Sequence, residues 1–208
     1  MRHRGSYSSG LFAVAAMVAA LLVWPAAGEA QLGGILPGGI LPGTTTVLSD
    51  TGTLAAGTSD ALQASRLTGS IPSLLTGEVL HAVTIGYSDA IDSEASLAAL
   101  RLNVAGISIG ADFIMARAMT LAGSAFGTSN IDNLSIDGVP VPVTGDPNQT
   151  VGIPGGVLVI NEQQVSGDGT TVVNALHAIV DGVADVVVAS ATAGASGGNA
   201  KAAQATTF

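Results

Sequence analysis

Three polar side chains interrupt apolar, β-branched runs near the C-terminus and could do chemistry there: Asn174, His177 and Asp185. A buried polar group must be hydrogen-bonded, because an unpaired one costs about 1–3 kcal/mol. In a regular strand Asn174 and His177 point to opposite faces, since side chains alternate. We therefore expect these three residues, with Asp112 in an earlier strand, to form a structural polar network that fixes strand register, and we name no catalytic residue.

A second group of side chains carries oxygen atoms that could bind Ca²⁺ loosely. Its members are Asn130, Asp132, Asn133 and Asp137. Their spacing matches no EF-hand loop, which needs a glycine at a fixed position and a terminal bidentate glutamate. Turns are also rich in Asn and Asp for backbone reasons alone. Ca²⁺ is therefore the one cofactor that the sequence suggests, as an alternative to ordinary turn chemistry.

Motifs that activate a nucleophile or bind phosphate are missing from the sequence, which has no Gly-x-Ser-x-Gly elbow and no Ser-x-x-Lys motif. His81 and His177 have no partner at metal-ligand spacing, so zinc has little support. Glu78 and Glu162 could be imagined as a glycosidase pair, but so could any two acids. We expect a domain without a catalytic centre, with a secreted hydrolase acting on polysaccharide or peptide as the alternative.

The elements that must position these side chains are β-strands, since β-branched runs alternate with Gly, Asp and Asn from Thr44 to Gly194. The clearest hairpin joins residues 171–180 to residues 183–192 through Asp181-Gly182. Asp-Gly favours a two-residue type I′ turn, which needs positive φ at both central positions. Such a turn pairs Val180 with Val183. Residues 157–166 precede this hairpin and complete an antiparallel meander.

Two further segments have strand patterns. Asp137-Gly138 joins two short runs, and Pro140 places the second of them at an edge, because proline cannot donate to a ladder. Alternation over residues 107–115 predicts one shared face for five apolar residues: Ile107, Ile109, Ala111, Phe113 and Met115. We predict a mainly β, antiparallel, sandwich-like single domain. Residues 111–118 resemble residues 184–191, which keeps a β-solenoid as the alternative.

The N-terminal sequence suggests processing and export. Arg2 and Arg4 precede an apolar core, and Gly28-Glu29-Ala30 offers small residues to a signal peptidase, so residues 1–30 are predicted to be a signal peptide. Residues 31–43 repeat Gly-Gly-Ile-Leu-Pro and are predicted to be a linker. The β domain then covers residues 44–194, and residues 195–208, which are small and polar, are predicted to be a disordered tail.

The composition restricts the partners. The net charge is −9, and removal of residues 1–30 leaves four basic residues against fourteen acidic ones. A nucleic-acid partner is not expected, because binding nucleic acid requires a basic surface. There is no cysteine, so an exported domain of this size gains no disulfide. Aromatic residues make up only 3% of the chain, so the core must be aliphatic.

Four parts of the chain form an ordered series: Leu134–Val141, Pro147–Val151 with Ile160–Gln163, Val173–His177 and Ala184–Ala191. Together they resemble the bacterial choice-of-anchor P family of exported surface proteins. The resemblance implies an exported bacterial domain whose relatives carry different C-terminal anchors, and it implies no activity. We expect a secreted cell-surface or extracellular-matrix protein with a structural or adhesive role. Its partner would be a surface or matrix component, and the mature chain would carry no integral membrane anchor.

Overall fold

The computed structural model describes residues 44–195 and 197–207. Within these ranges the chain forms thirteen strands and no helix. The strands are β1 (Thr44–Asp50), β2 (Ala61–Ile71), β3 (Leu75–Gly86), β4 (Ala90–Val104), β5 (Ile107–Leu121), β6 (Ser124–Asp132), β7 (Ser135–Ile136), β8 (Val139–Pro140), β9 (Gln149–Ile153), β10 (Gly156–Val165), β11 (Thr171–Val180), β12 (Ala184–Gly194) and β13 (Gly197–Thr207). The predicted signal peptide at residues 1–30 and linker at residues 31–43 lie outside the described residues.

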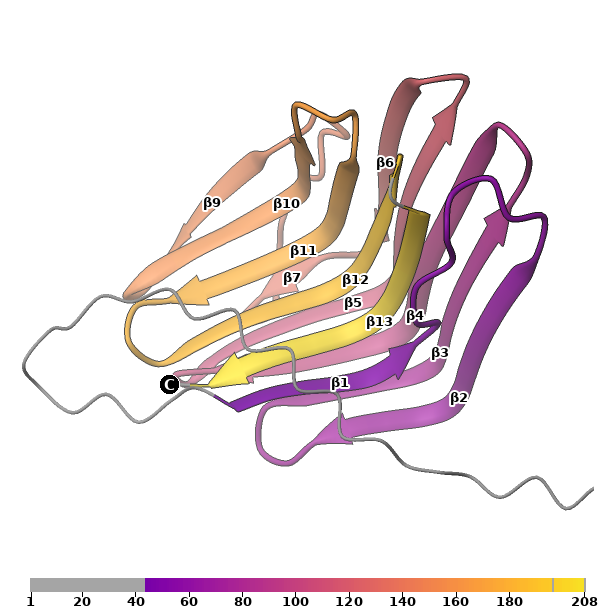
Figure 1. The fold of residues 1–208 in the computed structure, drawn as a ribbon. Helices are drawn as coiled ribbons and strands as arrows, with labels where there is room; N and C mark the ends of the chain where they lie inside the picture. The colour runs from indigo at the N-terminus through magenta and orange to yellow at the C-terminus, as the bar shows by residue number, and fades with distance from the viewer. Residues whose placement is uncertain (1–43, 196, 208) are drawn as a thin grey trace, which may run out of the picture. The chain divides into compact units, whose positions relative to one another are not determined.

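The strands form two antiparallel sheets that pack face to face (Figure 1). The six-stranded sheet has the order β1-β13-β12-β11-β10-β9. The seven-stranded sheet has the order β2-β3-β4-β5-β7-β8, with β6 also paired to β5. Strand β12 packs on β4 and β5, and β11 packs on β5 and β6, so the core lies between the sheets. The predicted sandwich-like domain is confirmed, whereas a β-solenoid would stack successive repeats as parallel strands.

The core is aliphatic, as the composition predicted. The largest fully buried side chains are leucines, isoleucines and a valine from both sheets: Leu75, Leu80, Ile91, Leu97, Leu100, Leu102, Val104, Ile109, Ile114, Leu158, Ile160 and Leu176. Four buried alanines of β13 face them, namely Ala200, Ala202, Ala203 and Ala205. Small residues on one sheet leave room for large residues on the other, which is how facing layers reach the packing density of protein interiors.

Both sheets bend about halfway along their long strands (Figure 1). The backbone φ is positive at Val79 in β3 (49°) and Ala99 in β4 (49°), and at Asn161 in β10 (52°) and Ala189 in β12 (54°). A left-handed residue inside a strand reverses the alternation of side chains beyond it. In β12 the core-facing residues are Ala184, Val186 and Val188 before the bend, and Ala189, Ala191 and Ala193 after it.

The alternation also breaks in β5, although no residue of this strand has positive φ, and this break corrects the predicted face of residues 107–115. Ile107, Ile109 and Ala111 are buried as expected, but Ile114 follows them into the core at a spacing of three residues. Phe113 and Met115 are only half-buried and lie on the other side of β5. A strict period of two therefore describes this strand only as far as the bend.

The six-stranded sheet lies on the inner side of the bend (Figure 1). Strands β4 and β5 each have 15 residues, whereas β11 has 10 and β12 has 11, as expected if the outer layer follows the longer path. At the bend, Leu67 and Val79 of the outer layer are 83% and 60% exposed, whereas Asn174 of the inner layer is 8% exposed. We call the solvent-facing side of the six-stranded sheet the concave face.

The two Asp-Gly hairpins differ. Asp137 and Gly138 both have positive φ (50° and 77°), and their neighbours Ile136 and Val139 pair directly, which confirms a two-residue loop with Pro140 on the edge strand β8. Strands β11 and β12 pair antiparallel as predicted, but Val180 pairs with Ala184 rather than Val183. Here only Gly182 has positive φ (67°), and the loop has three residues.

The prediction of a disordered tail at residues 195–208 is wrong for residues 197–207, which form β13. This strand lies between β1 and β12 and pairs with both. The sequence suggested disorder because the segment is rich in Ala and Gly, which are weak strand formers. What the composition concealed is that Ala200, Ala202, Ala203 and Ala205 face the core, so that burial rather than intrinsic propensity holds the strand.

Candidate functional site

A histidine held between two carboxylates lies on the concave face. His177 Nδ1 is 2.9 Å from Oε2 of Glu162, and His177 Nε2 is 2.7 Å from Oδ1 of Asp185. Asn174 Nδ2 donates to the same Oε2 of Glu162 at 2.6 Å. These four residues, which we call the His177 cluster, come from β10, β11 and β12. The cluster therefore connects three adjacent strands through side chains as well as through the backbone ladder.

The bend brings Asn174 and His177 onto one face, which corrects the prediction that they point to opposite faces. Between them, Ala175 and Leu176 are both fully buried in the core. Two consecutive core-facing residues leave the residues on either side of them facing outward together. The register shift of the β11–β12 hairpin brings Asp185 onto the same face as His177, because it places Ile179 rather than Ala178 opposite Asp185.

Glu162 is the centre of the cluster. Burial raises the pKa of its carboxyl, but the hydrogen bond from Asn174 and the charge and hydrogen bond of His177 outweigh burial, so the pKa lies below its ordinary value. Gln164 Nε2 adds a further hydrogen bond, to Oε1 at 3.2 Å. The ionised form of Glu162 is thus the one that its surroundings stabilise.

A polar row across the sheet passes through the same place. Glu162, Asn174, Ser190, Lys201 and Asp50 are successive cross-strand partners on β10, β11, β12, β13 and β1. Directly opposite side chains in antiparallel strands are close enough to interact. The row marks the bend on the concave face, where a slip of β11, β12 or β13 by one residue would replace a polar neighbour with a buried apolar residue.

The geometry limits what the cluster can do chemically. A general base needs a free lone pair within reach of a proton that it abstracts. Both nitrogens of His177 instead face a carboxylate oxygen. The carboxylates lie on opposite sides of the ring, so the three groups do not converge on one point, and within residues 44–195 and 197–207 no group of three potential ligands could hold a metal ion.

Asp112, the fourth member of the predicted network, lies apart from the other three. It belongs to β5 in the other sheet and accepts a hydrogen bond from Asn133 Nδ2 at 2.7 Å. The structure brings Asn174, His177 and Asp185 together, and it places Asp112 apart from them, in contrast to the prediction. Glu162, which joins Asn174 to His177, was missing from the predicted network. It stands directly opposite Asn174, and that register is what reveals it.

The candidate Ca²⁺ ligands have separate structural roles. Asp137 Oδ1 accepts a hydrogen bond from the backbone N–H of Ser108 at 2.8 Å. Asn133 and Asp137 both have positive φ (54° and 50°), as Asn and Asp in turns often do. Asn130 and Asp132 are exposed on β6. Their placement is thus accounted for by turn and strand-edge roles.

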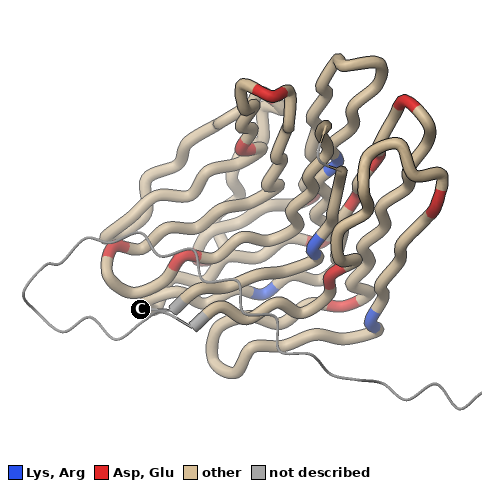
Figure 2. Tube along the Cα trace, in the orientation of Figure 1, with Lys and Arg blue, Asp and Glu red and all other residues tan. Residues whose placement is uncertain are grey.

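The remaining acids and histidine are scattered. Glu78 is exposed on β3 of the seven-stranded sheet, whereas Glu162 lies on β10 of the other sheet, so the two form no glycosidase pair. His81 lies on β3 and its Nδ1 is 2.8 Å from Ser65 Oγ. Charged side chains are sparse over both sheets, with acids more frequent than bases (Figure 2).

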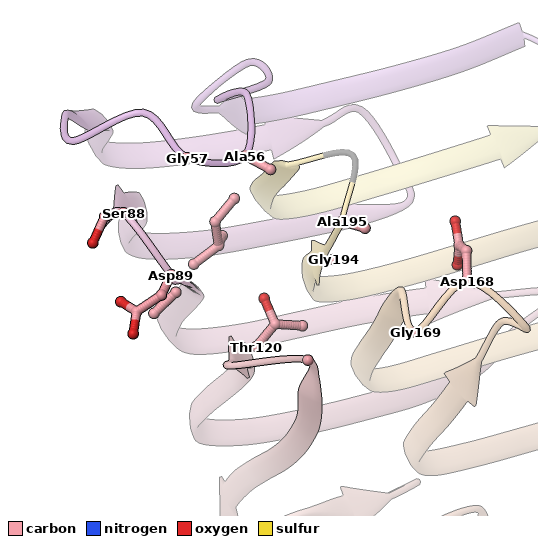
Figure 3. Close-up of a pocket in the computed structure, with 12 residues that line it drawn as sticks. Ala56, Gly57, Ser88, Asp89, Thr120, Asp168, Gly169, Gly194 and Ala195 are labelled. Carbon is pink, nitrogen blue, oxygen red and sulfur yellow. The ribbon is translucent and has the colours of Figure 1, made fainter.

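A hollow at one end of the sandwich contains two acids that do not converge. Asp89 and Asp168 come from separate loops and lie on opposite sides of the hollow in Figure 3. Asp168 Oδ1 accepts a hydrogen bond from the backbone N–H of Thr170 at 2.9 Å, within its own loop. That bond lowers the pKa of Asp168. The hollow therefore offers no acid–base pair, and His177 is not among the residues that line it.

Comparison with protein-family models, with curated proteins and with solved structures finds no match to this chain. The functional argument therefore rests on the chain's own residues. In the part of the chain that the structure describes, no helix is long and apolar enough to cross a membrane.

Proposed function

We propose that this chain is an exported bacterial protein of the cell surface or extracellular matrix, with a structural or adhesive role. One observation carries the proposal: the titratable side chains that the fold brings together form hydrogen bonds with one another. Glu162, His177 and Asp185 tie three strands to each other, and each ring nitrogen of His177 faces a carboxylate rather than solvent. Such a cluster stabilises the shape of a sheet and presents no activated group to a substrate.

The sequence at the N-terminus supports export. The basic start, the apolar core and the Gly28-x-Ala30 exit have the features of a cleaved signal peptide. The resemblance to choice-of-anchor P proteins points to the same compartment. An aliphatic sandwich without disulfides and with a net negative charge is also compatible with a place outside the cell, because net charge keeps a protein from associating with itself.

Export is tested by expressing the full chain in a bacterial host and separating cytoplasm, envelope and medium. We expect the protein in the envelope or medium, with Gln31 as its first residue by N-terminal sequencing. A variant in which both small residues of the cleavage site are replaced, Gly28→Lys with Ala30→Lys, should accumulate uncleaved. Recovery of the wild-type chain from the cytoplasm with Met1 in place would overturn the proposal.

A structural or adhesive role is tested in the source bacterium. Cells that lack the protein should attach less to surfaces or retain less matrix, and the wild-type chain should restore both. The restoring activity should survive His177→Gln if the variant remains folded, because the role assigned to His177 is to hold strands together. Unchanged attachment and unchanged matrix in the deletion strain would contradict this role.

The alternative is a secreted hydrolase acting on polysaccharide or peptide. The observation in its favour is that three acid–base residues, Glu162, His177 and Asp185, do meet on a concave face. A panel of polysaccharides and peptides tested with the purified protein distinguishes the two functions. Hydrolysis that is abolished by His177→Gln and retained in His81→Gln would establish the enzyme and exclude our proposal.

A further inference from the structure

The His177 cluster needs two protons on one ring. A neutral imidazole has a single N–H, and only the protonated ring donates from both nitrogens. The contacts of 2.9 Å to Glu162 and 2.7 Å to Asp185 are both hydrogen bonds only when Nδ1 and Nε2 each carry a proton. Removing one proton leaves a ring lone pair facing a carboxylate oxygen, which is repulsive.

The two carboxylates are not equivalent, which decides which contact is lost. The side chain of Glu162 is 15% exposed, and that of Asp185 is 41% exposed. Asp185 can exchange its ring contact for water at little cost, whereas a lone pair facing the more buried Glu162 would stay unscreened. A neutral His177 therefore keeps its proton on Nδ1, facing Glu162, and loses Asp185.

We propose that the His177 cluster is a proton-operated latch between β11 and β12, closed when the His177 ring carries two protons and released at Asp185 when it carries one. The proposal goes beyond the structural role, because it assigns the cluster a response to pH. Histidine is the side chain that most often serves as a proton-operated switch in proteins.

The other charged groups near His177 come from the neighbouring strands of the sheet and from the adjoining turn. On the concave face β10 contributes Glu162, β12 contributes Asp185, β13 contributes Lys201 and β1 contributes Asp50. Strand β9 contributes no titratable group. The adjoining β11–β12 turn contributes Asp181. Carboxylates and lysine ordinarily titrate outside the range from pH 5 to pH 8.

The released contact lies next to a turn. Asp185 pairs with Ile179, one position from the end pair of Val180 with Ala184. The turn itself is closed by one backbone hydrogen bond, from the N–H of Val183 to the carbonyl of Val180 at 3.0 Å. Loss of the side-chain bond should therefore loosen this end of the hairpin while β12 remains paired with β13 farther along.

The first test uses the wild-type full chain. Long-range ¹⁵N–¹H spectra should show both nitrogens of His177 protonated at low pH, and Nδ1 alone protonated after deprotonation. Amide protection factors at residues 184–186, corrected for the intrinsic pH dependence of exchange, should fall about tenfold between the two states, as for the loss of about 1.4 kcal/mol. Equal protection in both states, or a neutral ring protonated on Nε2, would overturn the latch.

The decisive variant is Asp185→Asn. An asparagine amide can accept from the protonated ring with its oxygen, and can donate to the neutral ring with its nitrogen after a flip. Protection at residues 184–186 should then stay high in both states. His81→Gln is the matched control and should leave the wild-type response unchanged. A tenfold fall that persists in Asp185→Asn would show that Asp185 is not the released partner and would refute the proposal.

Discussion

Asn174 and His177 donate to the same carboxylate oxygen, Oε2 of Glu162, although they stand three residues apart on one strand. A regular strand would send them to opposite faces. They share a face because the bend inserts two consecutive core residues, Ala175 and Leu176, between them. The polar cluster is therefore a product of the bend, and each supports the other.

Replacing Glu162 should test how far the polar cluster stabilises the folded state. We expect Glu162→Gln to lower the free energy of unfolding by about 1–3 kcal/mol near neutral pH, because a hydrogen-bonded charge in a partly buried network is lost. Urea unfolding measures the change. The matched control is Glu78→Gln, since Glu78 is exposed on β3; its effect should stay within about 0.5 kcal/mol.

The pH dependence of this effect has a definite sign. The pKa of Glu162 in the folded protein lies below its ordinary value of 4.5, so its ionised form stabilises the fold above that pH. The contribution is lost as the pH falls through the lower, folded-state pKa. The difference between wild type and Glu162→Gln should accordingly be full at pH 6 and shrink in acid, and a difference that grows in acid would contradict this assignment.

A further prediction concerns the bend of the seven-stranded sheet, at Ala99 of β4. Ala99 is exposed and has a φ of 49°, a conformation that disfavours a Cβ atom. Ala99→Gly should raise the free energy of unfolding by about 0.5–1 kcal/mol. The neighbouring Ala98→Gly has no positive φ to relieve and should lower it by about the same amount. Thermal and urea unfolding of both variants would show whether the signs differ.

The fold class followed from the sequence because several segments show local alternation and are separated by turns rich in Gly, Asp and Asn. The 137–138 hairpin came out correctly, since both turn residues tolerate positive φ. The bend did not, because its left-handed residues include Val79, Ala99 and Ala189, which carry no mark of that conformation in the sequence. The face assignments in β5 and β11 failed where the alternation breaks at the bend, and with them the prediction that Asn174 and His177 diverge.

Two further details depended on tertiary packing. The one-residue shift in the β11–β12 register accompanies a three-residue loop, in which the N–H of Asp181 donates to the carbonyl of Gly155 in the preceding hairpin. The strand at residues 197–207 depends on a core surface that alanine fills without strong strand propensity. Neither a neighbouring hairpin nor a facing layer is visible in a local sequence window.

The three-residue loop predicts the effect of a substitution at Gly182. Its φ is 67°, and a Cβ atom added there would meet nothing within 4 Å, so the cost is conformational and not steric. Gly182→Val should destabilise the fold by about 1–2 kcal/mol, because a β-branched residue resists positive φ. Gly167→Val is the control, since Gly167 also has open space and no positive φ. Equal effects of the two variants on the unfolding midpoint would contradict the loop conformation.

The last prediction concerns β13, where adjacent residues face opposite environments. Ala203 is fully buried, whereas its neighbour Gln204 is half-buried on the concave face, 3.5 Å from Lys201 Nζ through its Oε1. Ala203→Glu places an unpaired carboxylate between the sheets and should cost about 4 kcal/mol or more. Gln204→Glu introduces a carboxylate next to the ammonium group of Lys201 and should leave the free energy of unfolding nearly unchanged. Urea unfolding of both variants separates a packed strand from a free tail, because in a free tail neither substitution would change the free energy of unfolding.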